Sequence, residues 1–238
     1  MDFIDYVFNG SVKNWLVGCK MVMNCYTGTP GSGKSLHLAR DTMDYLRFGK
    51  TVISNFACKV EILENEKKGL LGRIFRAGKQ YGKFIFKPNQ EITVQYLVSY
   101  ALKYHKKAVE NQTLIAIDEC HILFNSRDWN MGDRNKWILF FTEHRKLGYN
   151  IILVTPNIRM LDKQIRGVFE NEVSHKCINQ YKLMWLLPGK TFIAINKWIG
   201  SRIKTSTEFF TYTKKCGQFY DSYATLGAFD NMEILTDV

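Results

Sequence analysis

The sequence predicts an α/β protein whose mainly parallel central sheet is flanked by helices. Three observations support this fold class. A short apolar run ends in a glycine-rich loop that a helical pattern follows, and two later runs, 114–117 (LIAI) and 151–154 (IILV), are apolar throughout, which is typical of strands buried on both faces. Helical patterns separate these runs, and strands that alternate with helices indicate parallel pairing with right-handed crossovers.

The expected elements, in order, are a strand at 21–27, a helix at 34–48, a strand at 51–55, a helix at 93–109, a strand at 114–117, a helix through 137–147, a strand at 151–154 and a helix at 161–169. Beyond residue 172 the pattern changes to short alternating segments. We therefore expect a C-terminal β-hairpin, formed by 182–187 and 191–195 around Pro188 and Gly189, at an edge of the sheet.

Composition limits the class of molecule. The chain has 238 residues, of which 46% are apolar and 23% charged, so it fits one globular domain and excludes collagen-like, coiled-coil and disordered proteins. Its formal net charge of +11 favours a polyanionic partner. The six scattered cysteines form no C-x-x-C pair, which indicates reduced core thiols. No apolar run reaches the roughly 18 residues of a membrane-spanning helix.

Residues 28–35 (GTPGSGKS) satisfy the pattern G-x-x-x-x-G-K-[ST] between a strand and a helix. In such a loop the backbone N–H groups and the helix N-terminus hold phosphates, Lys34 reaches the β- and γ-phosphates of ATP, and the Ser35 hydroxyl holds Mg²⁺. The alternative is a glycine turn with an exposed lysine. The expected nucleotide-binding residues are Gly28, Thr29, Pro30, Gly31, Ser32, Gly33, Lys34, Ser35 and Leu36.

An acidic pair, Asp118 and Glu119, follows the buried run 114–117. The carboxyl ends of parallel strands are where ligands bind, so Asp118 would hold Mg²⁺ through water and Glu119 would orient the attacking water. The alternative is a pair that merely caps a helix. Hydrolysis also needs positive charge at the γ-phosphate, and the candidates are Arg127, Arg145, Arg159 and Arg166.

Four segments together are more selective than the nucleotide motifs: 27–35 (TGTPGSGKS), 114–127 (LIAIDECHILFNSR), 143–157 (EHRKLGYNIILVTPN) and 160–173 (MLDKQIRGVFENEV). Over roughly residues 21–225 the chain resembles the zonula occludens toxin family of filamentous-phage morphogenesis ATPases. The resemblance implies a P-loop NTPase motor related to the FtsK/HerA group. By motif position it implies that Lys34 and Ser35 bind the nucleotide, that Asp118 and Glu119 are the acidic pair, and that Arg127, Arg145 and Arg166 are sensors or trans-acting fingers.

Two departures from this family pattern stand out. Pro156 and Asn157 follow Thr155 where the family usually places Gln, so Thr155 or Asn157 would have to sense the γ-phosphate. Many relatives also continue into a transmembrane helix and an outer domain. The expected organisation is an N-terminal arm at 1–20, an ATPase domain at 21–225 with a basic insertion at 59–88, and a tail at 226–238. The arm is either an interfacial helix or packed on its own domain.

The resemblance implies an ATP-hydrolysing motor that drives assembly and extrusion of filamentous single-stranded-DNA phage at the inner face of the host membrane. The expected partners are further copies of the chain in a ring, coat or assembly proteins, and a separate membrane-anchor protein, unless the chain is a soluble form or fragment. Basic segments at 67–87 and 173–217 suit single-stranded DNA or acidic membrane and protein partners. A small-molecule P-loop kinase and a non-hydrolysing nucleotide-dependent adaptor are the alternatives.

Overall fold

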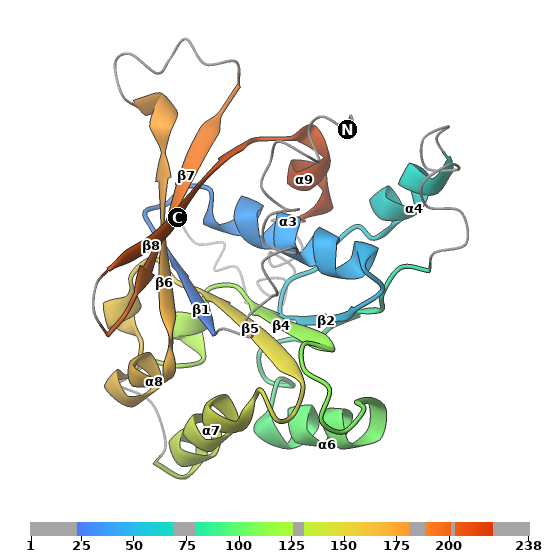
Figure 1. Ribbon diagram of the computed structural model, residues 1–238, viewed down its shortest axis with the longest axis vertical. Coiled ribbons are helices and arrows are strands. Elements are labelled where there is room, and N and C mark those ends of the chain that lie inside the picture. Colours follow the sequence, from blue (N-terminus) through green and yellow to red (C-terminus); the bar gives the residue numbers. More distant parts are fainter. Residues whose placement is uncertain (1–22, 69–79, 126–130, 181–188, 201–202, 221–238) are drawn as a thin grey trace, which may run out of the picture.

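The computed structural model describes residues 23–68, 80–125, 131–180, 189–200 and 203–220. Within these ranges one eight-stranded sheet has the order β3-β2-β4-β5-β1-β6-β7-β8 (Figure 1). The strands are β1 (Asn24–Thr27), β2 (Thr51–Ser54), β3 (Phe84–Phe86), β4 (Thr113–Ile117), β5 (Tyr149–Val154), β6 (Asn171–Cys177), β7 (Thr191–Trp198) and β8 (Lys204–Thr211). The first six are mutually parallel, and β7 and β8 add to β6 in antiparallel fashion.

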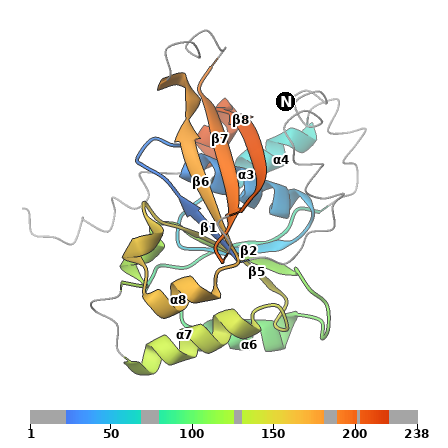
Figure 2. The same ribbon diagram turned by 60° about the vertical axis from the view of Figure 1, so that its left-hand side comes forward.

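Helices cover both faces of the sheet. The helices are α3 (Lys34–Arg47), α4 (Glu61–Lys68), α6 (Val94–Tyr104), α7 (Met131–Glu143), α8 (Lys163–Val168) and α9 (Lys214–Phe219), with short 3₁₀ turns η1 (Cys120–Ile122), η2 (Ile158–Met160) and η3 (Ile178–Gln180). Figure 1 shows α3 and α9 on one face, and α6 and α7 on the other. In the turned view of Figure 2, α8 lies beside α7 on that second face. In the described part of the chain, no helix is long and apolar enough to cross a membrane.

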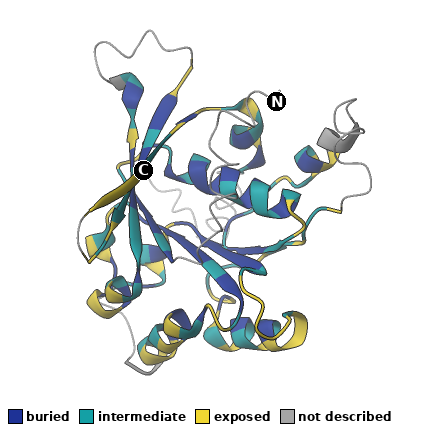
Figure 3. Cartoon of the chain, viewed as in Figure 1, coloured by how far each residue is buried: buried dark blue, intermediate teal, exposed yellow. Residues whose placement is uncertain are grey.

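The two apolar runs are strands buried on both faces, as the sequence predicts. In β4, Leu114 and Ala116 join the core under α3, whereas Ile115 and Ile117 join the core under α6 and α7. Strand β5 divides its side chains in the same way, and Figure 3 shows both strands buried at the centre of the sheet. The mainly parallel α/β fold is therefore confirmed, with the carboxyl ends of β1, β2, β4 and β5 at one edge.

The position of the C-terminal hairpin differs from the prediction. A hairpin is present at the sheet edge, but β7 and β8 form it, with Phe192 opposite Phe210 and Ala194 opposite Glu208. The other side of β7 pairs with β6, so both sides of residues 192–195 are occupied and 182–187 is not their partner. Residues 182–187 lie outside the described part of the chain, as do the arm at 1–20 and the tail at 226–238.

The region from 59 to 88 contributes to the sheet. Residues 84–86 form β3, which pairs in parallel with β2 at the edge opposite β8, with Ile85 beside Ile53. Helix α4 precedes it in the same region. The helix expected at 93–109 ends at Tyr104: the backbone of His105 is extended, and Ala108 has a positive φ angle that a helix does not allow.

Candidate active site

The glycine-rich loop joins β1 to α3 and depends on backbone conformations that only glycine adopts easily. Gly28, Gly31 and Gly33 have φ angles of +147°, +74° and +94°. A Cβ atom at Gly28 would lie 2.6 Å from the carbonyl oxygen of His175, and one at Gly33 would lie 2.6 Å from the ring of Phe192. Larger residues at these two positions would both strain the backbone and collide with the neighbouring strands.

The first turn of α3 is open toward this loop. Its N-cap residue is Gly33, which makes no side-chain capping hydrogen bond, and the 14-residue helix has no acidic residue in its first turn. The unsatisfied N–H groups and the positive end of the helix dipole are therefore directed at the loop. This arrangement favours an anion such as a phosphate.

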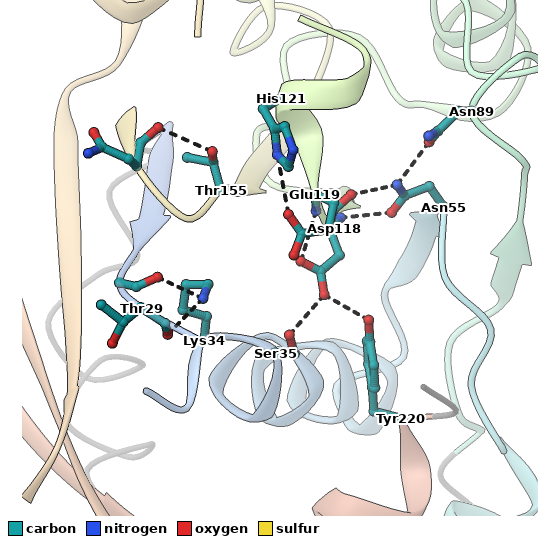
Figure 4. Close-up of polar contacts among 12 residues, drawn as sticks. Thr29, Lys34, Ser35, Asn55, Asn89, Asp118, Glu119, His121, Thr155 and Tyr220 are labelled. Atoms are coloured by element: carbon teal, nitrogen blue, oxygen red, sulfur yellow. Dashed lines mark hydrogen bonds and ion pairs between the residues drawn. The ribbon is translucent and has the colours of Figure 1, made fainter. Parts of the chain in front are cut away.

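Lys34 lies inside the loop. Its Nζ atom donates hydrogen bonds to the carbonyl oxygens of Gly28 at 2.8 Å and Thr29 at 3.1 Å, and the residue is only 7% exposed (Figure 4). Ser32 is also buried, and its Oγ atom has no hydrogen-bond partner among the described residues. The loop therefore holds one cation and one unsatisfied hydroxyl in a small volume, which suits a multiply charged oxyanion.

Asp118 connects the loop to the sheet. It directly follows β4, and its Oδ2 atom accepts hydrogen bonds from Ser35 Oγ at 2.9 Å and from the Tyr220 hydroxyl at 2.7 Å. Its Oδ1 atom accepts one from the backbone N–H of Glu119 at 2.8 Å. Both carboxylate oxygens are therefore fixed, and the residue is 6% exposed (Figure 4).

A side-chain amide holds the backbone of Asp118. Asn55, which directly follows β2, accepts from the Asp118 N–H at 2.7 Å and donates to the Asp118 carbonyl oxygen at 2.7 Å. The same amide donates at 2.9 Å to the Oδ1 atom of Asn89, which lies in the segment that follows β3. Asn55 thus ties together the carboxyl ends of β2, β3 and β4 at the site.

Glu119 extends from the sheet into solvent. Its backbone is left-handed, with φ of 48°, and its side chain is 51% exposed. Its Oε2 atom lies 3.2 Å from His121 Nδ1. Partial burial and the neighbouring Asp118 carboxylate raise the pKa of Glu119, while His121 and Lys34 oppose this shift. The pair therefore places an exposed carboxylate, which can accept a proton, beside a buried and hydrogen-bonded one.

The segment after β5 borders the loop through its backbone. The N–H of Gly28 donates to the carbonyl oxygen of Pro156 at 3.3 Å, and the N–H of Thr155 donates to that of Tyr26 at 2.9 Å. Thr155 is fully buried, and its hydroxyl donates to the carbonyl oxygen of Asn157 at 3.3 Å. The Oδ1 atom of Asn157 accepts from the Arg159 N–H at 2.9 Å, so it is engaged in capping η2.

The candidate arginines differ in their position relative to the loop. Arg159 is exposed on η2, shortly after the segment that borders the loop. Arg145 is exposed in the turn before β5, and that strand of six residues spans about 20 Å at roughly 3.3 Å per residue. Because β5 is parallel to β1, Arg145 lies at the opposite end of the sheet from the loop. Arg166 is half-buried on α8 and, among the described residues, makes no side-chain hydrogen bond or ion pair with the loop. Arg127 lies outside the described residues.

Three residues of this site are not among those that the sequence predicts. Asn55 stands at the carboxyl end of an expected strand, and that position was a usable signal. His121 follows the acidic pair closely and lies within the segment 114–127, which carries part of the family resemblance. Tyr220 gave no local signal, because its contact with Asp118 joins residues 102 positions apart.

Comparison with known proteins gives several relatives. The chain is 25% identical over 224 residues to the gene 1 protein of Enterobacteria phage f1 and 24% identical over 224 residues to that of Enterobacteria phage M13. Each alignment covers 89% of this chain and 61% of the relative. The chain therefore spans less than two thirds of the length of these relatives.

Two solved structures share the fold. The N-terminal domain of zonular occludens toxin from Neisseria meningitidis matches with a TM-score of 0.51 and 16% identity, over 85% of this chain and 100% of that one. A second solved structure, which is an ATPase domain, matches with a TM-score of 0.53 and 12% identity, over 84% of each chain. The family model described as zonular occludens toxin (Zot) matches residues 22–225, which include the loop, the acidic pair and Tyr220. The chain therefore belongs to the Zot family.

Proposed function

We propose that this chain is an ATP-hydrolysing motor domain that drives assembly and extrusion of filamentous single-stranded-DNA phage at the inner face of the host membrane. The observation that carries the enzymatic part is the 2.9 Å contact between Ser35 of the loop and Asp118 after β4, with Glu119 beside it. The cellular part rests on membership of the Zot family and on relatives that are gene 1 proteins of phages.

The loop would bind the triphosphate of ATP. Its backbone N–H groups and the start of α3 face the phosphates, and Lys34 exchanges the carbonyl oxygens of Gly28 and Thr29 for phosphate oxygens. The Ser35 hydroxyl and the Asp118 carboxylate are the oxygen donors that suit Mg²⁺, so these two residues would hold the ion. Mg²⁺, when bound, neutralises charge on the β- and γ-phosphates.

Glu119 would act as the general base. Its carboxylate is exposed enough to reach a water molecule, and its raised pKa brings its proton affinity closer to that needed at neutral pH. The water oxygen forms a bond to the γ-phosphorus while the bond to the bridging oxygen breaks, and a water proton passes to Glu119. Inorganic phosphate and ADP leave. Asn55 supports this step by fixing the backbone beneath both acids.

Arg145 would complete the site of a neighbouring subunit. It is exposed, and it is too far along β5 to reach the loop of its own chain. A ring in which one subunit presents this end of its sheet to the next subunit's loop would bring the Arg145 charge to the γ-phosphate. Coat or assembly proteins, single-stranded DNA and a membrane-anchor protein are the further partners we propose, with the net charge of +11 favouring the polyanion.

ATP turnover by the purified protein tests the enzymatic proposal, with and without single-stranded DNA. We expect release of free phosphate without a small acceptor, and a loss of about 10²-fold or more in Glu119→Gln, since that is the usual contribution of a general base. Glu119→Gln should still bind nucleotide, whereas Lys34→Ala should bind it weakly and fail to support virion release. Phosphate found only on an added acceptor would indicate a kinase, and binding without turnover an adaptor.

A further inference from the structure

The end of α9 inserts a phenol into the site beside the loop. The Tyr220 hydroxyl donates to Asp118 Oδ2 at 2.7 Å, the same oxygen that accepts from Ser35 at 2.9 Å. In Figure 4 the Tyr220 and Ser35 side chains approach this carboxylate from neighbouring elements. No step of the hydrolysis outlined above uses Tyr220.

Tyr220 is held in place from several sides. The N–H of Lys59 donates to the carbonyl oxygen of Phe219 at 3.0 Å, and Cys58 and Tyr220 form an antiparallel bridge. The Phe56 ring packs on the Tyr220 ring with centroids 5.1 Å apart. Phe219 is fully buried. The ring position is therefore set by the segment that follows β2, independently of the hydroxyl contact.

The phenol can act only as a donor toward the carboxylate. The Tyr220 hydroxyl donates to Oδ2, because a carboxylate oxygen can only accept a hydrogen bond. A hydroxyl donor adds no charge of its own to the site. It also fixes the rotation of the carboxyl group, because Oδ1 is held by the Glu119 N–H.

We propose that Tyr220 is a positioning residue for the magnesium site, which orients the Asp118 carboxylate toward the cation and so couples the end of α9 to metal binding. This inference rests on the proposed function, since it requires that Ser35 and Asp118 hold Mg²⁺ with ATP. Hydrogen-bonded partners of metal ligands typically change metal affinity by about 10- to 100-fold when removed. Tyr220 is such a partner for Asp118.

The test is the Mg²⁺ dependence of nucleotide binding in Tyr220→Phe, which keeps the ring packed on Phe56. Affinity for a fluorescent ATP analogue is measured in EDTA and across a Mg²⁺ titration. We expect an affinity in EDTA within about twofold of wild type and a half-saturating Mg²⁺ concentration raised about tenfold or more. Mn²⁺ affinity of the nucleotide-bound protein, measured by electron paramagnetic resonance, should fall by the same factor.

Tyr212→Phe is the matched control. Tyr212 lies against Gly217 of α9, and its hydroxyl makes no hydrogen bond to Asp118. It should match wild type in both conditions. An unchanged Mg²⁺ dependence in Tyr220→Phe would overturn the proposal, and so would an equal loss of affinity with and without Mg²⁺, which indicates a general packing role. A wild-type protein that binds no nucleotide would refute the proposed function, and the inference would fall with it.

Discussion

At Gly33 the glycine-rich loop touches the C-terminal hairpin. Its left-handed backbone begins α3, and the space that a side chain would need is filled by the Phe192 ring of β7. This position therefore requires glycine for two separate reasons: the left-handed backbone conformation and the lack of space for a side chain. Gly167 in α8 has neither, because its φ angle is not positive and a Cβ atom there would meet no atom of the described residues within 4 Å.

We expect Gly33→Ala to lower the free energy of unfolding by about 1–3 kcal/mol, from backbone strain alone, and to weaken nucleotide binding through displacement of the loop. Gly167→Ala should instead stabilise by about 0.5–1 kcal/mol, as alanine does within helices. Urea denaturation of both variants measures the difference. Equal stability changes for the two variants would contradict this account.

Some residues of the site can be predicted from short sequence motifs, and others cannot. Lys34, Ser35, Asp118 and Glu119 could be proposed from the sequence, because each lies in a short string whose position after a strand has a direct geometric meaning. Tyr220 could not, because its contact with the site depends on how distant segments pack. The left-handed conformation of Glu119 was equally invisible, since Glu is not a residue that favours it.

Among the elements, a buried polar cluster joins α3 to β1, β6 and β8. His37 Nδ1 lies 2.8 Å from His175 Nε2, and His175 Nδ1 lies 3.2 Å from the carbonyl oxygen of Thr27, directly before the loop. The Tyr26 hydroxyl donates to Asp41 Oδ2 at 2.5 Å. An ion pair between Arg40 of α3 and Glu208 of β8 closes the cluster toward the sheet edge.

This cluster contains groups with opposite pH dependence. Burial lowers the pKa of His175 to about 4 and lowers that of His37 well below its ordinary value, so their stabilising contribution is present above pH 6.5 and is lost as pH falls. Burial raises the pKa of Asp41 to about 7, so its contribution is present at low pH and is lost as pH rises toward 7. Between pH 4 and 6.5 the two contributions therefore oppose each other.

We expect Asp41→Asn to make the protein more sensitive to acid than wild type, because the substitution removes the group that opposes the histidines. Asparagine can still accept the Tyr26 hydrogen bond, so the fold should persist. Urea midpoints measured between about pH 4.5 and 7.5, the window in which these groups titrate, should fall more steeply toward acid in the variant. Parallel pH curves for the two proteins would show that Asp41 does not titrate in this window.

The side chains of adjacent residues in β8 point to opposite faces of the sheet. Phe210 is 2% exposed and stacks on Phe192 with centroids 5.4 Å apart, whereas Phe209 is 59% exposed. We expect Phe210→Ala to lower the free energy of unfolding by about 3–5 kcal/mol, and Phe209→Ala to change it by less than about 0.5 kcal/mol. Chemical denaturation checks both. Similar losses for the two variants would mean that the hairpin pairs in another register.

The elements that sequence analysis missed carry weak patterns. Strand β8 (KTSTEFFT) begins with a run of polar residues, so it lacks the apolar run that predicts a buried strand. Strand β3 (FIF) is apolar but has only three residues, and it lies between Lys83 and Lys87. The strands β4 and β5 were predictable because each contains a continuous apolar run. The predicted hairpin segments are wrong because the second strand of the hairpin, β8, is the polar one.

At the scale of the whole molecule, the loop and Arg145 lie at opposite ends of the sheet, so Arg145 could reach a loop only in another subunit. We expect mixtures of Arg145→Ala and Glu119→Gln to regain part of the ATP turnover that each variant loses alone, because some interfaces then join an intact loop to an intact arginine. Turnover across a series of mixing ratios is the measurement. No recovery at any ratio would exclude Arg145 as the trans-acting residue.

The last described segment crosses the molecule. From β8 at one edge of the sheet, the chain passes over α3 as α9 and reaches the residues after β2 and β4, near the other edge (Figure 1). The antiparallel hairpin is thus connected to the parallel strands by this packed chain segment as well as by the pairing of β7 with β6. The hairpin cannot separate from the parallel strands without breaking both sets of contacts, so thermal denaturation should proceed as one cooperative transition and not as two.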